Sequence, residues 1–244
     1  MGVMGRALPW ALAVLIGAAD ASADQAAPPV LVELFTSQGC SSCPPADALA
    51  GELAKRADVV VLSYHVNYWD YIGWADPFAT DDTTNRQYLY AAALKLGNVY
   101  TPQMVIGGIA DVVGSDERRV TRAIETVRTR LPQAPAIAIA GTGDGIRVTL
   151  GPGRYDGVAD VLLVLFDRRH ETDVRRGENS GRRLTNYNSV RTFERIGGWT
   201  GAAAEIDLTA AELAGSDACA VIVQAPGQGP VIAATSFDMA TLER

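Results

Sequence analysis

The chain has 244 residues, of which 48% are hydrophobic and 20% are charged, as expected for a globular protein with a real core. Its formal net charge of -7 argues against nucleic acid as a partner, because binding to phosphates needs a basic face. Its three cysteines are too few for a scaffold that disulfides hold together. The length allows one large or two modest domains.

Residues 1–23 have the pattern of a secretory signal peptide. Arg6 precedes a mostly apolar stretch at residues 8–19, and Ala21-Ser22-Ala23 fits the small residues that signal peptidase needs. A retained membrane anchor is the alternative, but the stretch is shorter than the roughly 20 residues that span a bilayer. We therefore expect cleavage after residue 23, a periplasmic or secreted mature protein and no stable membrane insertion. Disulfides form and persist in those compartments.

The next part of the chain alternates between strand and helix patterns. Apolar runs predict strands at residues 30–36, 59–64 and 99–106, and a Gly107-Gly108 turn leads into a short strand ending at residue 113. Apolar residues spaced by three and four predict helices at residues 44–56 and 84–96, and a last helix that Ser115 caps. The order β-α-β-α-β-β-α indicates an α/β domain with parallel strands, a terminal hairpin and a final helix.

Strand patterns dominate after Pro132 and Pro135. They cover residues 136–140, 146–150, 158–166, 190–196, 203–208, 218–224 and 231–237. Turns rich in Gly, Pro and Asp separate them, which is typical of an all-β sandwich. We therefore predict an α/β domain at residues 24–133 and a β-sandwich-like domain at residues 134–244.

Cys40-Ser41-Ser42-Cys43 lies at the junction of the first predicted strand and the first predicted helix. A thiolate there faces unpaired backbone N–H groups and the positive end of the helix dipole, which both lower the thiol pKa. We expect Cys40 to be exposed and to attack, and Cys43 to resolve the mixed disulfide. Pro44 fits the first helical turn, where a missing N–H costs little.

Two other features suggest parts of the same site. Glu33 lies in the preceding strand, where an acid is costly to bury without a partner or a role, so we expect it to accept the proton of Cys43. Thr101-Pro102 opens a later strand, where proline is unusual and a cis bond would be a deliberate feature. A cis proline packed against the disulfide would leave the Thr101 backbone free to pair with an extended peptide.

These features together resemble the thioredoxin-fold oxidoreductases. More narrowly, four segments resemble a secreted bacterial family, domain of unknown function 1223: VELFTSQGCSSCPPAD, SYHVNYWDYIGW, YTPQMVIGG and RRGENSGRRLTNYNSVR. The resemblance implies a thioredoxin-like domain at residues 24–133 with an appended β-domain. Its members usually carry an aspartate where this chain has Asn67.

The cysteine pair has other interpretations. It is a redox pair, a structural disulfide or part of a metal site. A zinc site needs four ligands, and the chain has no second CxxC to supply them. His65 could join Cys40 and Cys43 in binding copper, could tune the thiols, or could be a hydrogen-bonded histidine beneath the loop that follows. Cys219 lies in an apolar strand and is expected to be a buried free cysteine.

Two loops also have open interpretations. The aromatic loop after His65 is either a substrate platform, with Tyr68, Trp69 and Trp74 as its binding residues, or a packed cap over the sheet. A charged run is either a solvated face or a surface for an anion or for the neighbouring domain; it contains Arg175, Arg176, Glu178, Asn179, Arg182 and Arg183.

The sequence thus favours an exported thiol–disulfide oxidoreductase acting on a protein or small-molecule thiol or disulfide, without a cofactor. A Cu(I)-binding or copper-delivery module that uses Cys40, Cys43 and His65 is the second hypothesis. A redox-inactive interaction scaffold is the third.

Overall fold

The computed structural model describes residues 28–130 and 134–241, so the predicted signal peptide lies outside the described residues. The main sheet contains β1 (Val30–Thr36), β2 (Val59–His65), β3 (Gln103–Ile106), β4 (Ala110–Val113), β7 (Ala159–Asp173), β8 (Arg183–Trp199), β10 (Ala218–Gln224) and β11 (Val231–Asp238). The helices are α1 (Pro44–Leu53), α2 (Asp81–Ala93) and α3 (Glu117–Arg128), with short 3-10 turns at Asp70–Ile72 and Met239–Thr241. A small antiparallel sheet contains β5 (Ile137–Thr142), β6 (Gly145–Leu150) and β9 (Ala204–Thr209).

The first half follows the predicted order of elements. β1 pairs in parallel with β2 and antiparallel with β3, which pairs antiparallel with β4. α2 begins three residues before its predicted start, because Thr80 caps it through a reciprocal capping box with Thr83. The N-cap of α3 is Asp116 rather than the predicted Ser115, and its carboxylate accepts the Arg119 N–H.

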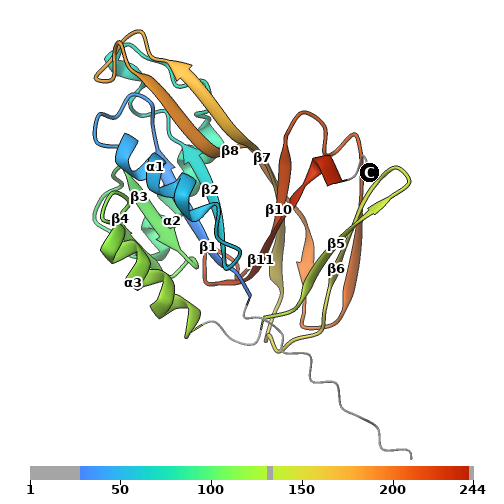
Figure 1. The fold of residues 1–244 in the computed structure, drawn as a ribbon. Coiled ribbons are helices and arrows are strands. Elements are labelled where there is room, and N and C mark those ends of the chain that lie inside the picture. The colour runs from blue at the N-terminus through green and yellow to red at the C-terminus, as the bar shows by residue number, and fades with distance from the viewer. Residues whose placement is uncertain (1–27, 131–133, 242–244) are drawn as a thin grey trace, which may run out of the picture.

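Both faces of β1 are buried, which explains its continuous apolar run. Val32 and Leu34 pack with α1 and α3, while Leu31 and Phe35 point the other way, towards Tyr90 of α2. Helices therefore cover the two faces of this strand, as Figure 1 shows. None of the described helices is long and apolar enough to cross a membrane.

The two predicted domains share one sheet. Its strand order is β11-β10-β7-β8-β2-β1-β3-β4, and β8 joins β2 in parallel at the Ser63–Ser189 pair. The expectation of a separate all-β domain at residues 134–244 is therefore corrected to a mixed sheet that runs through both halves. β7 and β8 are also longer than predicted, because their paired ends are polar and carry little hydrophobic pattern.

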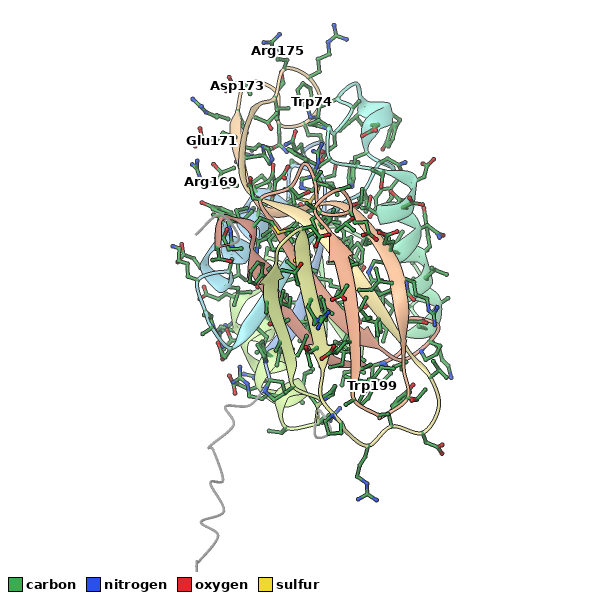
Figure 2. All side chains as sticks on the ribbon, turned by 90° about the vertical axis from the view of Figure 1, so that its right-hand side faces the viewer. Trp74, Arg169, Glu171, Asp173, Arg175 and Trp199 are labelled. Atoms are coloured by element: carbon green, nitrogen blue, oxygen red, sulfur yellow. A yellow bond between two sulfur atoms is a disulfide. The ribbon has the colours of Figure 1, made fainter. Side chains whose placement is uncertain are left out.

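The second half does contain two sheets packed face to face, as expected for a sandwich. The three-stranded sheet packs on one face of β7 and β10, with Val148, Leu163 and Val221 in the shared core. The opposite face of β7 and β10 contributes Phe166 and Ala220 to the core around α2. Figure 2 views the molecule from the side of the small sheet, with Trp199 at one end and Trp74 and Arg175 at the other.

Candidate functional site

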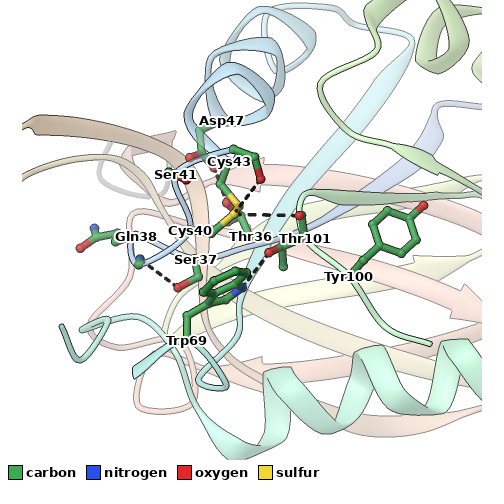
Figure 3. Close-up of a disulfide and its surroundings, with 12 residues drawn as sticks. Thr36, Ser37, Gln38, Cys40, Ser41, Cys43, Asp47, Trp69, Tyr100 and Thr101 are labelled. Atoms are coloured by element: carbon green, nitrogen blue, oxygen red, sulfur yellow. Dashed lines mark hydrogen bonds between the residues drawn. A yellow bond between two sulfur atoms is a disulfide. The ribbon is translucent and has the colours of Figure 1, made fainter. Parts of the chain in front are cut away.

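Cys40 and Cys43 form a disulfide at the start of α1 (Figure 3). Cys43 is the N-cap residue and Pro44 occupies the first turn, as predicted from the sequence. The turn is closed by the Cys43 N–H, which donates to the Cys40 carbonyl at 3.2 Å. The Ser42 hydroxyl lies 3.2 Å from Sγ of Cys40, where it can donate to the sulfur. The CxxC segment therefore has the predicted position, between β1 and the helix.

Cys40 is completely buried, with an exposed fraction of 0%. This corrects the prediction of an exposed attacking sulfur. Ser41 and Ser42, between the two cysteines, are exposed, so only part of the CxxC turn is buried. The amide nitrogen of Asn179, from the β7–β8 loop, donates to the Cys40 carbonyl at 2.9 Å, and Gly39 packs against Trp69. Segments that lie far away in the sequence thus pack against the turn that carries Cys40.

Thr101-Pro102 is a cis peptide bond, and it lies beside the disulfide. Sγ of Cys40 is 4.0 Å from the Thr101 carbonyl oxygen. The indole N–H of Trp69 donates to the Thr101 hydroxyl at 2.8 Å, which ties the aromatic loop to this segment. The structure therefore brings Cys40, Thr101 and Trp69 together, as Figure 3 shows.

Tyr68 and Trp74, the other predicted binding residues, make hydrogen bonds within the protein. The Tyr68 hydroxyl donates to Gln87 at 3.1 Å, and the Trp74 indole donates to Gln38 at 3.1 Å. Tyr68 belongs to the margin of the core around α2. These contacts are those of a packed cap over the sheet, and a role in substrate binding stays a prediction.

Glu33 is not brought to the disulfide. Its carboxylate pairs with Arg86 of α2 at 2.7 Å and accepts a hydrogen bond from the Tyr90 hydroxyl. Residues 33 and 36 of one strand point to opposite faces, and Thr36 is the one on the side of α1. The expected proton transfer between Glu33 and Cys43 therefore has no geometric support.

Asp47 is the buried acid on the side of α1. It follows Cys43 by four residues and so lies on the same helix face, and only 3% of it is exposed. The Thr36 hydroxyl donates to its Oδ1 at 2.8 Å. Burial raises the pKa of Asp47 to about 7, and the charge of His65 and the hydrogen bond from Thr36 limit the rise. Figure 3 shows Asp47, Thr36 and Cys43 close together.

Asp47 was not predicted as a site residue, because the helix dipole alone explains an acid in the first turn of a helix. The available signal was its spacing of four residues from Cys43 within a helix whose other inward residues are apolar.

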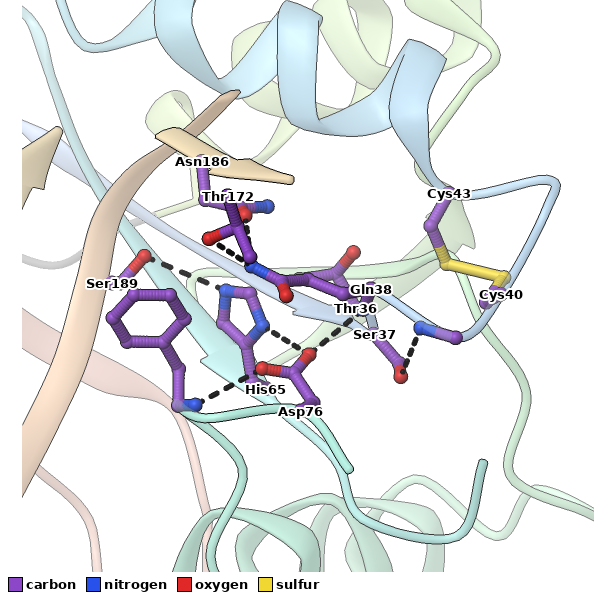
Figure 4. A network of polar contacts seen from close by, with 12 residues as sticks. Thr36, Ser37, Gln38, Cys40, Cys43, His65, Asp76, Thr172, Asn186 and Ser189 are labelled. Carbon is purple, nitrogen blue, oxygen red and sulfur yellow. Dashed lines mark hydrogen bonds and ion pairs between the residues drawn. A yellow bond between two sulfur atoms is a disulfide. The ribbon is translucent and has the colours of Figure 1, made fainter. Parts of the chain in front are cut away.

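His65 is buried near Asp47 and forms a hydrogen-bonded pair with Asp76, as Figure 4 shows. Its Nδ1 lies 2.7 Å from Oδ2 of Asp76, and its Nε2 faces the Ser189 hydroxyl at 3.5 Å. Burial opposes the charged imidazole, but the Asp76 carboxylate outweighs burial and raises the pKa of His65. The pair also lowers the pKa of Asp76 despite burial. This is the hydrogen-bonded histidine that the sequence allowed.

Gln38 connects this hydrogen-bonded pair to the CxxC turn and to the β7–β8 hairpin. Its N–H donates to Asp76 at 2.7 Å, and its side-chain amide donates to Thr172 at 3.0 Å and to Asn186 at 2.9 Å. Nδ2 of Asn186 has no hydrogen-bond partner within the structure's described ranges, although its amide lowers the pKa of Asp47. A continuous polar network therefore lies behind the disulfide.

No group of three or more His, Cys, Asp or Glu side chains among residues 28–130 and 134–241 is arranged to hold a metal ion. The copper hypothesis with Cys40, Cys43 and His65 thus gains no support from the geometry. Cys219 is a buried free cysteine, and burial raises its pKa to about 11.

The family model described as "Protein of unknown function (DUF1223)" matches residues 31–224. The chain belongs to the DUF1223 family. Its structure is similar to that of protein AGR_C_4864 from Agrobacterium tumefaciens, a structural genomics target, with a TM-score of 0.78 and 34% identity over 87% of this chain and 95% of that one. HBP35 of Porphyromonas gingivalis has a similar fold, with a TM-score of 0.56 and 12% identity over 87% of this chain and 76% of that one. No curated protein matches.

The resemblance to this family that four sequence segments suggested is confirmed. Membership supports the fold and the CxxC segment without assigning a reaction, since the family itself is described as being of unknown function.

Proposed function

We propose that this DUF1223 protein is an exported thiol–disulfide oxidoreductase whose thioredoxin-like unit uses Cys40 and Cys43. One observation carries the proposal: the disulfide lies at the N-terminus of α1, with a buried, titratable Asp47 one turn further along the same helix. A structural disulfide needs neither feature. Export follows from the signal-peptide pattern at residues 1–23, and an oxidising compartment suits the pair.

The reaction begins from the reduced pair. The Cys40 thiolate, which the helix N-terminus favours, attacks one sulfur of a substrate disulfide and forms a mixed disulfide. The other substrate sulfur leaves as a thiolate and takes a proton from water. No other oxidant or reductant takes part in this step.

The second step closes the protein disulfide. The Cys43 thiol gives its proton to the Asp47 carboxylate, and the Cys43 thiolate then attacks Sγ of Cys40. The remaining substrate sulfur leaves and is protonated. The protein dithiol is thereby oxidised by two electrons and the substrate disulfide is reduced to two thiols. The reverse sequence oxidises a substrate dithiol, with Asp47 returning the proton.

The Thr101 carbonyl supports a peptide substrate. It lies 4.0 Å from Sγ of Cys40, so an extended chain that donates an N–H to it would bring its own sulfur close to the attacking atom. The Trp69 indole fixes the Thr101 side chain by donating a hydrogen bond to its hydroxyl. We infer that the substrate class is a protein or small-molecule disulfide or dithiol.

Reduction of insulin disulfides with dithiothreitol as donor tests the proposal. We expect the wild-type protein to accelerate the reaction and both Cys40→Ser and Cys43→Ser to abolish turnover. Cys219→Ala is the matched control, and it should keep the wild-type rate because Cys219 lies in the core between the two sheets. Wild-type protein that gives only the rate of dithiothreitol alone, on insulin and on oxidised glutathione, would refute the proposal and favour the scaffold hypothesis.

A further inference from the structure

The loop between β7 and β8 lies directly over the CxxC turn. We define the strap as residues 174–182, most of the charged run noted in the sequence. Asn179 is buried at 0% exposure, and its side-chain nitrogen donates to the carbonyl oxygens of Gln38 and Cys40, both at 2.9 Å. The Glu178 carboxylate accepts the Ser41 N–H at 3.1 Å. Two consecutive strap residues therefore occupy main-chain groups of the turn that carries Cys40.

The strap is closed on itself and packed against the aromatic loop. The Gly181 N–H donates to the Val174 carbonyl at 2.8 Å, which closes its base. Gly177 has a φ of +74°, and a Cβ at this position would lie 3.3 Å from Cβ of Trp74 and 3.4 Å from Cδ1 of Ile72. Figure 2 shows Arg175 and Trp74 at the same end of the molecule. The strap thus contacts both the CxxC turn and the aromatic loop.

This arrangement conflicts with thiol–disulfide exchange in the closed state. A thiolate must approach a sulfur of the disulfide directly, yet Cys40 has no exposed surface. The Cys40 carbonyl and the Ser41 N–H, which could bind a substrate backbone, already have strap partners.

The strap has few contacts to lose on opening. Arg175, Arg176 and Glu178 are exposed, and the buried residues are Val174 at the base of the strap and the polar anchor Asn179. Segments with few buried apolar contacts open locally at low free-energy cost. Opening would expose the disulfide without unpairing the strands of the main sheet.

We propose that the strap is an intramolecular gate that covers the Cys40–Cys43 disulfide and that a substrate must displace. The inference deepens the proposed function, on which it rests for what enters the opened site. The covering itself is measurable without any substrate.

The test is the rate at which tris(2-carboxyethyl)phosphine reduces the disulfide of the folded protein. The phosphine attacks a sulfur and becomes a phosphine oxide with oxygen from water, and the disulfide becomes two thiols. Thiol titration under native conditions follows the reaction. We expect Asn179→Ala to speed reduction about tenfold, because it removes two hydrogen bonds that hold the gate closed. Arg176→Ala, on the exposed part of the strap, should stay within about twofold of the wild-type rate.

A pair of glycine variants supplies an independent test. Gly177→Ala and Gly181→Ala both place a side chain at positive φ, +74° and +80°, so they share the same kind of backbone strain. Only Gly177 packs against the aromatic loop, whereas Gly181 has nothing within 4 Å of its Cβ position. We expect reduction of Gly177→Ala to be at least about threefold faster than that of Gly181→Ala. Glu178→Gln, an exposed change that keeps the fold, should give about a two- to fivefold increase.

The outcomes separate the gate from the proposed function. Wild-type rates in Asn179→Ala, Glu178→Gln and Gly177→Ala, each with a wild-type melting temperature, would overturn the gate. An accelerated reduction in these variants supports the gate even if insulin turnover is absent, which would count only against the oxidoreductase.

Discussion

Glu33 and Asp47 are two buried acids on opposite sides of β1, and their surroundings differ in kind. Glu33 has a guanidinium partner, because Arg86 lies 2.7 Å away and stacks near the rings of Tyr64 and Tyr90. Asp47 accepts a hydrogen bond from the Thr36 hydroxyl, and the positive charge that acts on it, that of His65, is already paired with Asp76. The first acid belongs to a fixed ion pair inside the core, and the second changes its charge near neutral pH.

The comparison shows that burial alone does not identify a functional acid. A buried carboxylate with its own counter-charge serves the fold, whereas one whose counter-charge is shared with another acid keeps a raised pKa and is poised to exchange a proton. Burial opposes the charge of Arg86, but Glu33 outweighs burial and raises the pKa of Arg86. The proposed exchange therefore uses the side of β1 that faces α1 and the disulfide.

The largest expected effect comes from breaking the Glu33 pair. Arg86→Met leaves Glu33 buried without its counter-charge, and we expect a loss of about 3–5 kcal/mol in the free energy of unfolding. Urea unfolding of the oxidised protein measures it. The double variant Glu33→Gln, Arg86→Met should recover most of the loss, and the exchange rate per folded molecule should not change. A loss below about 1 kcal/mol would mean that the pair is not the structural unit described.

Asp47 should make stability depend on pH. Its pKa is about 7 in the folded protein against an ordinary value of 3.8, so the folded state binds more protons between these values. Stability therefore falls as pH rises through this window and levels off above it. Between about pH 4.5 and 7.5 we expect the wild type to lose roughly 3 kcal/mol relative to Asp47→Asn, which lacks this titration. Equal pH profiles in urea unfolding would contradict the raised pKa.

Asp47→Asn should also slow exchange. Without a proton acceptor, the Cys43 thiol ionises less readily, and we expect resolution of the mixed disulfide to slow about 100-fold near pH 7. Single-turnover trapping of the mixed disulfide with a glutathione adduct on Cys40 measures this step. Glu33→Gln is the control from the other side of β1. The assignment fails if Glu33→Gln slows resolution and Asp47→Asn does not.

The smallest expected effect comes from removing the hydroxyl groups that donate hydrogen bonds to these two acids. Thr36→Val removes the donor that lowers the pKa of Asp47, so this pKa should rise by less than about one unit. In a plot of exchange rate against pH, the rise on the acidic side should shift to higher pH by the same amount. Tyr90→Phe removes the hydroxyl that donates to Glu33 and should leave this rise in place. A shift of the same size in both variants would argue against the distinction between the two sides.

Local patterns predicted most of the elements. Residues 30–36 and 218–224 form strands with the predicted bounds, and the cysteine pair lies at the predicted helix start. Each of these features depends on neighbours within a few residues, through apolar runs or through the proline after Cys43.

Long-range features escaped prediction because their partners are distant in the sequence. Asn179 covers Cys40 across 139 residues, and Arg86 pairs with Glu33 across 53. The pairing of β2 with β8 was hidden for the same reason, since polar ends of β8 showed no strand pattern. Spacing from Cys43 could have indicated Asp47, but its burial depends on Thr36 and the core around α1.

The reduction potential of the Cys40–Cys43 pair tests the central claim most directly. Equilibration with glutathione redox buffers, read by mass after alkylation, measures it in the full chain with Cys219→Ala as background. We predict a potential between about -270 and -120 mV, the range of disulfides that cycle. A value below about -300 mV, typical of structural disulfides in secreted proteins, would contradict the oxidoreductase and leave the pair a permanent cross-link.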